Sequence, residues 1–391
     1  MPRIHLTGPV AAALFASASV VATPPAYTVT EIPTLGLANN GFEPGSVANC
    51  VTAGATVGYS ITFVDDRNIH AFRLTNGELT DLGVLPGDEH SMAFGANAAG
   101  DAVGVSYVLG NLTAHGVRWN TTGAPVLLGS IEPRDINSAG AIAGSTPVAG
   151  ALGTSHATLL VGTSSTDLGT LGGPSSMGFA LNEQNWVVGE SLLSDNRTTR
   201  AFVWRNGAML NLGTLGGATS RALDIDGLRV VGIADTTTQP HATMWTLNAD
   251  GSLASKTDLG TLPGATASAA YSVNASGVVV GTSNDRATRW TGGAIVDLNT
   301  LIDAESGWTL TRANSIDAAG RIAGVGKHGG VWRAFVLTPH NAADLNNDGV
   351  VDSLDLAILL GAWGRSGSPA DLDGDGTVGS RDLGILLGSW S

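Results

Sequence analysis

The stretch from residue 187 to residue 217 decides the fold, because it contains three motifs that recur along the chain. It begins with Val187-Val-Gly189-Glu-Ser191, continues with Arg200-Ala-Phe202, and closes with Asn211-Leu-Gly-Thr-Leu-Gly-Gly217. Apolar residues at alternate positions are typical of β-strands, and the glycines indicate tight turns. The stretch therefore predicts three strands of one repeated β unit.

The first motif occurs seven times and defines the period of the repeat. Its glycines are separated by 46, 40, 45, 43, 49 and 43 residues. The seven glycines are Gly58, Gly104, Gly144, Gly189, Gly232, Gly281 and Gly324. A repeat of roughly 44 residues has the length of a four-stranded propeller blade.

The second motif also occurs seven times, and each copy follows a copy of the first. The copies begin at His70, His115, His156, Arg200, His241, Arg286 and Arg333. Because four of these positions carry the same His in the same place of the repeat, we interpret the His residues as structural, since an active site brings unlike residues together.

The third motif is displaced by one unit relative to the other two. Its first copy, Tyr27 to Gly36, precedes every copy of the other motifs, and the seventh unit ends at Thr338 without one. If the N-terminal strand completes the seventh blade, the ring closes without exposed sheet edges. The predicted fold is mainly β, a seven-bladed β-propeller over residues 27–339. A β-solenoid is the alternative, although a solenoid has no use for a split unit.

Composition excludes several classes of protein. Of 391 residues 13% are charged and 43% are hydrophobic, so the chain can bury a core. A formal net charge of -14 disfavours nucleic acids and anionic membranes as partners. The single cysteine, Cys50, allows neither an intrachain disulfide nor a cysteine-based zinc site.

Residues 1–22 are expected to form a signal peptide. A basic start with Arg3 precedes a weakly apolar stretch from Val10 to Val21, and Ala22 offers a small residue for cleavage. The apolar stretch is too short to be a transmembrane helix. We therefore expect a secreted protein, extracellular or on the cell surface, and a monomer.

With these motifs, residues 27–339 resemble the bacterial extracellular HAF-repeat family, which is named for the triplet His-Ala-Phe. That triplet is complete only at His70 to Phe72. The resemblance implies a secreted β-propeller-like protein, and it implies no set of catalytic residues.

Residues 344–391 form a second predicted domain, with two acidic loops 27 residues apart. Oxygen side chains at loop positions 1, 3, 5, 9 and 12, with Gly at position 6, are typical of EF-hand calcium loops. The candidate ligands are Asp344, Asn346, Asp348, Asp352 and Asp355 with the carbonyl of Val350, and then Asp371, Asp373, Asp375 and Asp382 with the carbonyl of Thr377. Gly379 leaves position 9 of the second loop without a side chain. Two bound calcium ions are predicted.

A helix is expected after each loop, with apolar residues at +3, +4 and +7. The two stripes are Leu356, Leu359, Leu360 and Trp363, and Leu383, Leu386, Leu387 and Trp390. We expect them to pack face to face.

This duplicated tail resembles a type I dockerin. The resemblance implies calcium-dependent folding and docking to a cohesin or a cell-surface partner, often in polysaccharide degradation. It also implies partner contacts at loop positions 10 and 11, here Ser353, Leu354, Ser380 and Arg381.

Three functional hypotheses follow. The first is a non-catalytic propeller that binds a glycan or a protein and is tethered by a calcium-loaded dockerin. The second is a carbohydrate-active enzyme, a glycoside hydrolase or lyase, which requires two carboxylates about 5 to 9.5 Å apart. The only carboxylates outside the repeat pattern that could serve are Asp88, Glu89, Glu132, Glu190 and Glu305. The third is a surface structural protein without a specific ligand.

Overall fold

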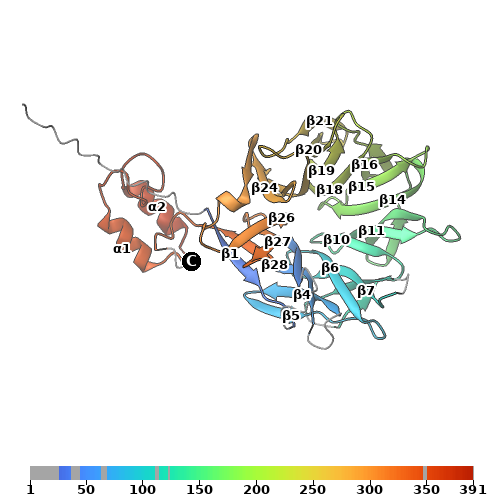
Figure 1. The fold of residues 1–391 in the computed structure, drawn as a ribbon, viewed down its shortest axis with the longest axis horizontal. Helices are drawn as coiled ribbons and strands as arrows, with labels where there is room; N and C mark the ends of the chain where they lie inside the picture. The colour runs from blue at the N-terminus through green and yellow to red at the C-terminus, as the bar shows by residue number, and fades with distance from the viewer. Residues whose placement is uncertain are drawn as a thin grey trace, which may run out of the picture.

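The computed structural model describes residues 26–36, 45–62, 68–110, 114–121, 124–346 and 350–390. The predicted signal peptide and Asp348 lie outside these residues. Within them, seven four-stranded antiparallel sheets stand in a ring (Figure 1), and two short helices follow.

Each sheet is one blade, and in blades one to six the strands are arranged in chain order from the centre of the ring to the rim. Blade one holds β2 (Ser46–Val51), β3 (Thr56–Ile61), β4 (Ile69–Thr75) and β5 (Glu78–Asp81). Blade two holds β6 (His90–Ala96), β7 (Ala102–Tyr107), β8 (Ala114–Trp119) and β9 (Val126–Leu127). Blade three holds β10 (Glu132–Ile136), β11 (Ile142–Pro147), β12 (Ser155–Val161) and β13 (Ser164–Asp167). Blade four holds β14 (Gly172–Leu181), β15 (Val187–Leu193), β16 (Thr199–Arg205) and β17 (Ala208–Asn211).

The last three blades complete the ring. Blade five holds β18 (Ser220–Asp226), β19 (Arg229–Asp235), β20 (Pro240–Leu247) and β21 (Leu253–Asp258). Blade six holds β22 (Ser268–Val273), β23 (Val279–Ser283), β24 (Arg286–Thr291) and β25 (Ala294–Asp297), followed by the short 3-10 helix η1 (Leu298–Thr300). Blade seven holds β26 (Trp308–Ile316), β27 (Ile322–His328), β28 (Val331–Pro339) and, at the rim, β1 (Tyr27–Ile32).

Strand β1 closes the ring, as the displaced third motif predicts. It pairs antiparallel with β28, from Tyr27 opposite Pro339 to Ile32 opposite Ala334. Blade seven thus takes its outer strand from the start of the propeller and the other three from its end. The solenoid alternative is wrong, because the seven separate sheets form a ring that β1 closes by completing blade seven.

The motif glycines are explained by a bulge in the inner strand of each blade. In all seven inner strands one residue is inserted relative to the second strand: Asn49, Phe94, Arg134, Phe179, Leu223, Tyr271 and Asn314. A Cβ added at Gly58 would lie 1.9 Å from the carbonyl oxygen of Val47, and one at Gly189 would lie 1.8 Å from that of Met177. Only glycine therefore fits opposite the bulge.

Hydrogen bonds at the turns after the inner strands link all neighbouring blades. The side chain of Asn97 donates to the Asn137 carbonyl at 3.2 Å, and Asn137 donates to the Asn182 carbonyl at 3.1 Å. The remaining links are Asn182 to Gly227, Arg229 to Ala275, Asn274 to Asp317, Arg321 to Thr52, and Thr52 to Asn97. Apolar clusters such as Val188, Val203, Ile225 and Trp245 fill the space between adjacent blades.

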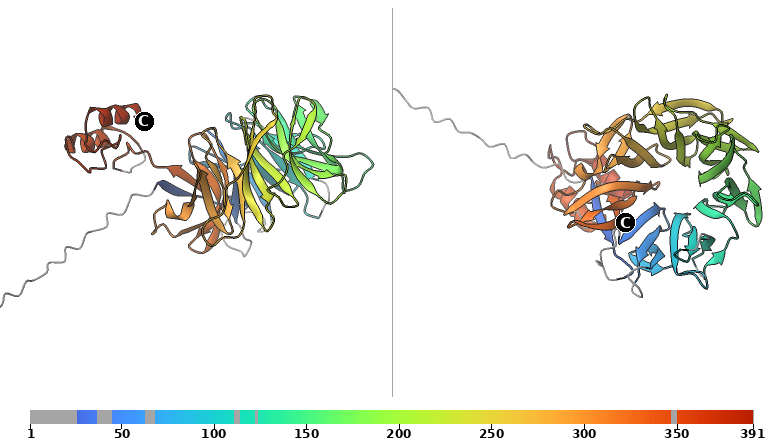
Figure 2. Two further views of the ribbon diagram at one scale, coloured as in Figure 1. Left: turned by 90° about the horizontal axis from the view of Figure 1, so that it is seen from above. Right: turned by 45° about the vertical axis from the view of Figure 1, so that its right-hand side comes forward.

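The helical tail is a separate small unit beside blade seven (Figure 2). It consists of α1 (Ser353–Gly361) and α2 (Ser380–Gly388) with a loop before each. Its core consists of residues related by the 27-residue repeat, among them the pairs Ala343 and Ala370, Val351 and Val378, and Leu359 and Leu386. The backbone N–H of His340 donates to the Ala26 carbonyl at 3.0 Å, so the tail leaves the ring next to the start of β1.

Candidate functional site

The second tail loop gathers three carboxylates around one point. Ligand oxygens of Asp371, Asp373 and Asp375 lie within 4.8 Å of one another. Oδ1 of Asp371 is buried and has no hydrogen-bond partner among the described residues, whereas its Oδ2 accepts from Gly376 N at 2.9 Å. Gly376 has a φ of +98°, which this sharp turn requires. Clustered carboxylate oxygens and an unpartnered buried oxygen fit a hard divalent cation such as calcium.

Position 12 of each loop anchors the loop to its helix. Asp355 is fully buried and accepts from the backbone N–H groups of Leu345 at 2.7 Å, Asn346 at 3.0 Å and Asp352 at 2.9 Å. Asp382 repeats this with Leu372, Asp373 and Gly379 at 2.6, 3.0 and 2.6 Å. The hydrogen bond from Gly379 and its two companions lower the pKa of Asp382, so this carboxylate stays ionised.

The other predicted ligands can be placed in part. Asp352 accepts from Leu354 N at 2.7 Å and caps α1, whereas Gly379 gives α2 no side-chain cap. Thr377 donates its backbone N–H and its hydroxyl to Asp375 Oδ1, at 2.9 and 3.1 Å. Asp344, Asn346 and Val350 lie in the first loop beside Asp348, which the structure does not describe.

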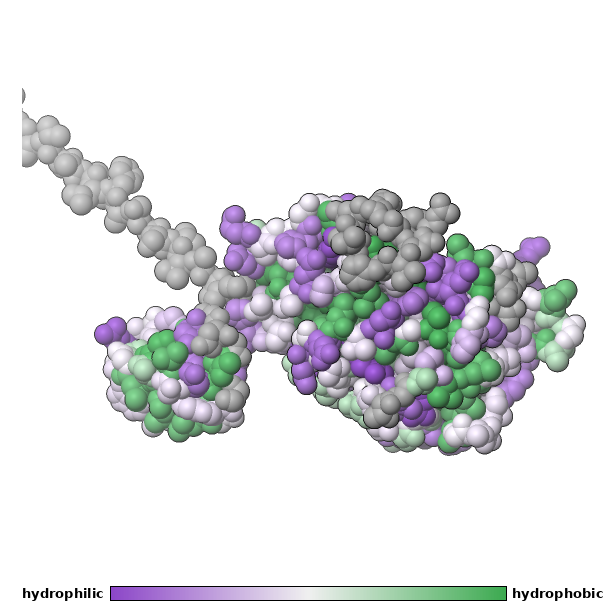
Figure 3. Space-filling view, turned by 90° about the horizontal axis from the view of Figure 1, so that it is seen from below, coloured by the Kyte–Doolittle hydropathy of each residue, from purple (hydrophilic) through white to green (hydrophobic). Residues whose placement is uncertain are grey.

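The predicted partner contacts all lie on the surface of the tail. Ser353, Leu354, Ser380 and Arg381 are exposed at the starts of the two helices. Hydrophobic residues colour much of the surface of this unit green in Figure 3, and several large apolar side chains of the unit are exposed. These exposed residues are Leu354, Ile358, Leu360, Trp363, Ile385, Leu387 and Trp390, which we call the docking face.

The docking face corrects the prediction that both apolar stripes pack face to face. Leu359 and Leu386 are fully buried and Leu356 and Leu383 pack against them. Leu360 and Leu387 are each 52% exposed, and Trp363 and Trp390 are each 46% exposed. Large apolar side chains left exposed on so small a unit are candidates for contact with a binding partner.

In the propeller, the repeated His residues bind acidic partners in their own blades. Nδ1 of His70 lies 2.9 Å from Asp81, that of His156 2.8 Å from Asp167, and that of His241 2.9 Å from Asp258. Each Asp opens a copy of the third motif, so these pairs join the third strand to the rim strand. Burial opposes ionisation of Asp81, but the hydrogen bonds from His70 and Gly83 lower its pKa.

Apart from the neighbours Asp88 and Glu89, the off-repeat carboxylates lie in different blades. Asp88 pairs with His115 at 3.0 Å, Glu190 pairs with Arg221 at 2.6 Å, and Glu132 pairs with Arg134. Glu89 lies beside Asp88, and Glu305 lies in an exposed loop before β26. These carboxylates therefore pair with cationic side chains or face the solvent, and the structure does not bring them together as a catalytic pair.

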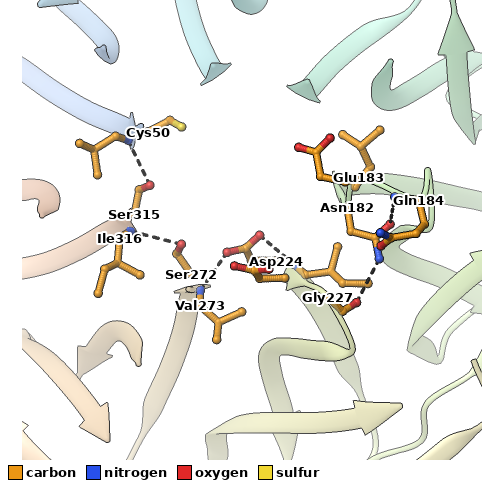
Figure 4. Close-up of a pocket in the computed structure, with 14 residues that line it drawn as sticks. Cys50, Asn182, Glu183, Gln184, Asp224, Gly227, Ser272, Val273, Ser315 and Ile316 are labelled. Carbon is orange, nitrogen blue, oxygen red and sulfur yellow. Dashed lines mark hydrogen bonds between the residues drawn. The ribbon is translucent and has the colours of Figure 1, made fainter. Parts of the chain in front are cut away.

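Two carboxylates that sequence analysis missed, Asp135 and Asp224, directly follow the bulges of their inner strands. The residue after each bulge is Cys50, Gly95, Asp135, Ala180, Asp224, Ser272 or Ser315. Cys50, Asp224, Ser272 and Ser315 line a central cavity of about 330 Å³ (Figure 4). These positions cannot be recognised from the sequence, because the bulge interrupts the alternation of apolar and polar residues by which a strand is identified.

The inner carboxylates join one blade to the next. Asp135 Oδ2 accepts from Leu181 N at 3.0 Å, and Asp224 Oδ2 accepts from Val273 N at 2.9 Å. Ser315 makes the same link with Val51 N at 3.1 Å. Burial raises the pKa of Asp135 to about 6 and that of Asp224 to about 7, and the charge of Asp135 adds to the shift of Asp224.

We expect the propeller to lose stability as the pH rises from 5 to 8. The folded-state pKa values of Asp135 and Asp224 lie above the ordinary 3.8. Their contribution to stability is therefore complete below about pH 4 and is lost as pH rises through 6 and 7. Both side chains are partly exposed to solvent, which reduces the effect to an order of 1 kcal/mol, so the melting temperature should fall by about 3 °C.

Calorimetry in excess calcium at pH 5 and pH 8 measures this fall. Asp224→Ser should reduce it by about half, because Ser272 and Ser315 fill the equivalent position in blades six and seven. The exposed Asp303→Ser serves as the control. If Asp224→Ser leaves the pH dependence of the melting temperature unchanged, the loss of stability does not arise from the ionisation of Asp224.

Comparison with known proteins supports two parts of this description. Residues 342–387 match the Dockerin type I domain. No curated protein matches the chain. A puromycin-hydrolyzing peptidase from Mycobacterium tuberculosis has a similar structure, at a TM-score of 0.53 and 12% identity, over 81% of this chain and 54% of that one.

TolB from Acinetobacter baumannii is similar at a TM-score of 0.42 and 10% identity, over 73% of this chain and 64% of that one. The chain therefore spans less than two thirds of the length of these two structures. At such identities the similarity concerns the fold alone.

A type I dockerin binds calcium and indicates a cohesin as partner in an extracellular complex. Among the described residues, no helix has the length and apolar character that a membrane crossing demands.

Proposed function

We propose that this protein is a secreted, non-catalytic binding protein that attaches through its dockerin to a cohesin, in a polysaccharide-degrading context. In this proposal residues 1–22 are a signal peptide, residues 27–339 are a saccharide-binding propeller related to the HAF-repeat family, and residues 344–391 are the dockerin. The observation that carries it is the docking face next to a loop that fits calcium, within a domain matched as a type I dockerin.

The proposal assigns one calcium ion to each loop. Asp371, Asp373, Asp375 and Asp382, with the Thr377 carbonyl, would hold the ion in the second loop. Asp344, Asn346, Asp348, Asp352 and Asp355, with the Val350 carbonyl, would hold the other. Bound calcium neutralises the loop carboxylates and fixes the helix starts, where Ser353, Leu354, Ser380 and Arg381 would contact the cohesin.

Surface plasmon resonance of the full chain over an immobilised type I cohesin tests the attachment. We expect binding in calcium and none in EGTA. Because Leu354 and Arg381 lie on different halves, the paired variant Leu354→Asp with Arg381→Asp should weaken binding by at least about tenfold. Leu152→Asp, at an exposed leucine of blade three, is the matched control. Equal binding in calcium and EGTA would contradict the proposal.

The enzymatic alternative is less well supported. Asp135 and Asp224 follow the bulges of their inner strands, and both oxygens of each accept backbone N–H groups. This engagement favours a structural role over acid–base catalysis. Asp226 and Glu183 line the central cavity together with Asp224. Release of reducing ends from a polysaccharide panel, lost in Asp224→Ser, would reverse this conclusion.

A further inference from the structure

A cavity of about 800 Å³ lies between blades six and seven. Blade six contributes Tyr271, Asn284 and the carboxylate of Asp285, and blade seven contributes Arg312, Lys327 and Trp332. The volume is within the range of small-molecule sites, and such sites combine aromatic walls with a few polar groups. We call this cavity the interblade groove.

The groove is built where blade seven departs from the other blades. Trp332 precedes the second motif, where the other blades have Ile69, Ala114, Ser155, Thr199, Pro240 and Asp285. Strand β26 also carries a second bulge, at Thr311, beside the one that all inner strands share. Bulges often redirect side chains next to binding sites. Thr311 and Arg312 both line the groove.

Two cations in the groove, Arg312 and Lys327, form no ion pair within the described parts of the chain, although the carboxylate of Asp285 also lines the groove. The Arg312 guanidinium lies 5.9 Å from the centre of the Tyr271 ring, and Nζ of Lys327 lies 5.0 Å from that of Trp332. Neither cation forms an ion pair there, although acidic residues outnumber basic ones 33 to 19. Arg312 is exposed, and Lys327 and Trp332 are half-buried. Their N–H groups can therefore bind an incoming anion.

We propose that the interblade groove binds an acidic oligosaccharide, one whose sugar rings carry carboxylates. The faces of the sugar rings would lie on Tyr271 and Trp332, and Arg312 and Lys327 would bind the carboxylates. The hydroxyl of Thr309 and the side-chain NH2 of Asn284 suit the sugar hydroxyls, whereas the hydroxyls of Thr282 and Thr311 donate to backbone carbonyls. The overall charge of -14 disfavours denser polyanions such as nucleic acids. This inference rests on the proposed function, in which the propeller binds a saccharide.

Isothermal titration of the full chain in calcium with a tetragalacturonate tests the groove. Arg312→Gln and Lys327→Gln should each weaken binding about tenfold. Lys256→Gln, at the only other lysine, and the exposed Arg197→Gln should leave it unchanged. Trp332→Ala should weaken binding by a similar factor, and Trp332→Phe should restore most of the affinity. Recovery with Phe would show that the Ala variant loses an aromatic contact to the sugar rather than the folded structure of the groove.

The outcomes distinguish this inference from the proposed function. Binding of alginate and polygalacturonate, but not of neutral galactan or xyloglucan, in affinity electrophoresis supports the groove. Binding of neutral polymers alone overturns the acidic specificity and leaves a saccharide-binding propeller in place. Binding of no polymer overturns both the acidic specificity of the groove and the saccharide-binding propeller. If Lys256→Gln weakens binding as much as Lys327→Gln does, the attraction is non-specific and the groove is not the binding site.

Discussion

A chain that starts at Ala38, and so lacks β1, is expected to lose the single cooperative melting transition of the propeller. Strand β1 pairs with β28 at six positions, and Ile32 is fully buried with Phe72 of blade one and Ala334 of blade seven. Tyr27 accepts a hydrogen bond from Arg289 of blade six at 3.0 Å. Loss of β1 therefore exposes blade seven and removes contacts to both of its neighbours. Replacing the single buried residue Ile32 by Ala should already cost about 2 to 5 kcal/mol.

Calorimetry and the reactivity of Cys50 measure this loss. Burial raises the pKa of the Cys50 thiol to about 12, and the nearby charge of Asp135 adds to the shift. The thiol of the closed ring should therefore react slowly with a disulfide reagent at pH 8. In the truncated chain it should react at the rate of an unfolded cysteine. A chain that starts at Ala26 is the reference, and equal melting and equal reactivity of the two chains would refute closure by β1.

Removal of calcium is expected to unfold the dockerin and leave the propeller intact. The loops bring several carboxylates together, and their repulsion opposes a compact loop in the absence of a cation. The core of this unit has few buried side chains, so metal binding should supply much of its folding free energy. Saturation at 100 times the dissociation constant adds roughly 2.7 kcal/mol per site.

Circular dichroism of residues 340–391 with calcium and then with EGTA measures the helix content. Asp375→Ala should abolish the second site. Asp382→Ala should reduce the helix content further, because Asp382 also accepts three backbone N–H groups. Asp348→Ala in the first loop should cost more than Asp375→Ala, since Gly379 leaves the second loop without a ligand at position 9. Equal helix content with and without calcium would refute metal-dependent folding.

The sequence predicted the blade number and the closing strand because their signals are local. A glycine opposite each bulge and the third motif repeat within every unit, so the displaced copy at Tyr27 indicated closure. The inner strands were not recognised, because their bulges interrupt the alternation of apolar residues. Their best signal is an Asn or Asp followed by Gly three residues later, as at Asn97 and Gly100 or Asn274 and Gly277.

Of the candidate sites, only the calcium loops could be predicted from the sequence. Loop ligands follow a fixed spacing and could be named in advance, whereas the docking face could not. Leu360 and Leu359 have the same hydropathy, yet only Leu359 is buried, because so small a unit covers one side of each helix. The interblade groove arises from residues of two blades, and no spacing within one repeat unit brings Tyr271 and Trp332 together.

The position of β28 determines how a tethered protein bears load. The dockerin follows Pro339 directly, so tension from a cohesin-bound dockerin pulls on the end of β28. This strand is not at a sheet edge, because β1 holds it on one side and β27 on the other. Pulling along its axis loads its hydrogen bonds to both neighbours in parallel, as in shear, rather than opening them one at a time. We therefore expect the dockerin to give way under force before the ring opens.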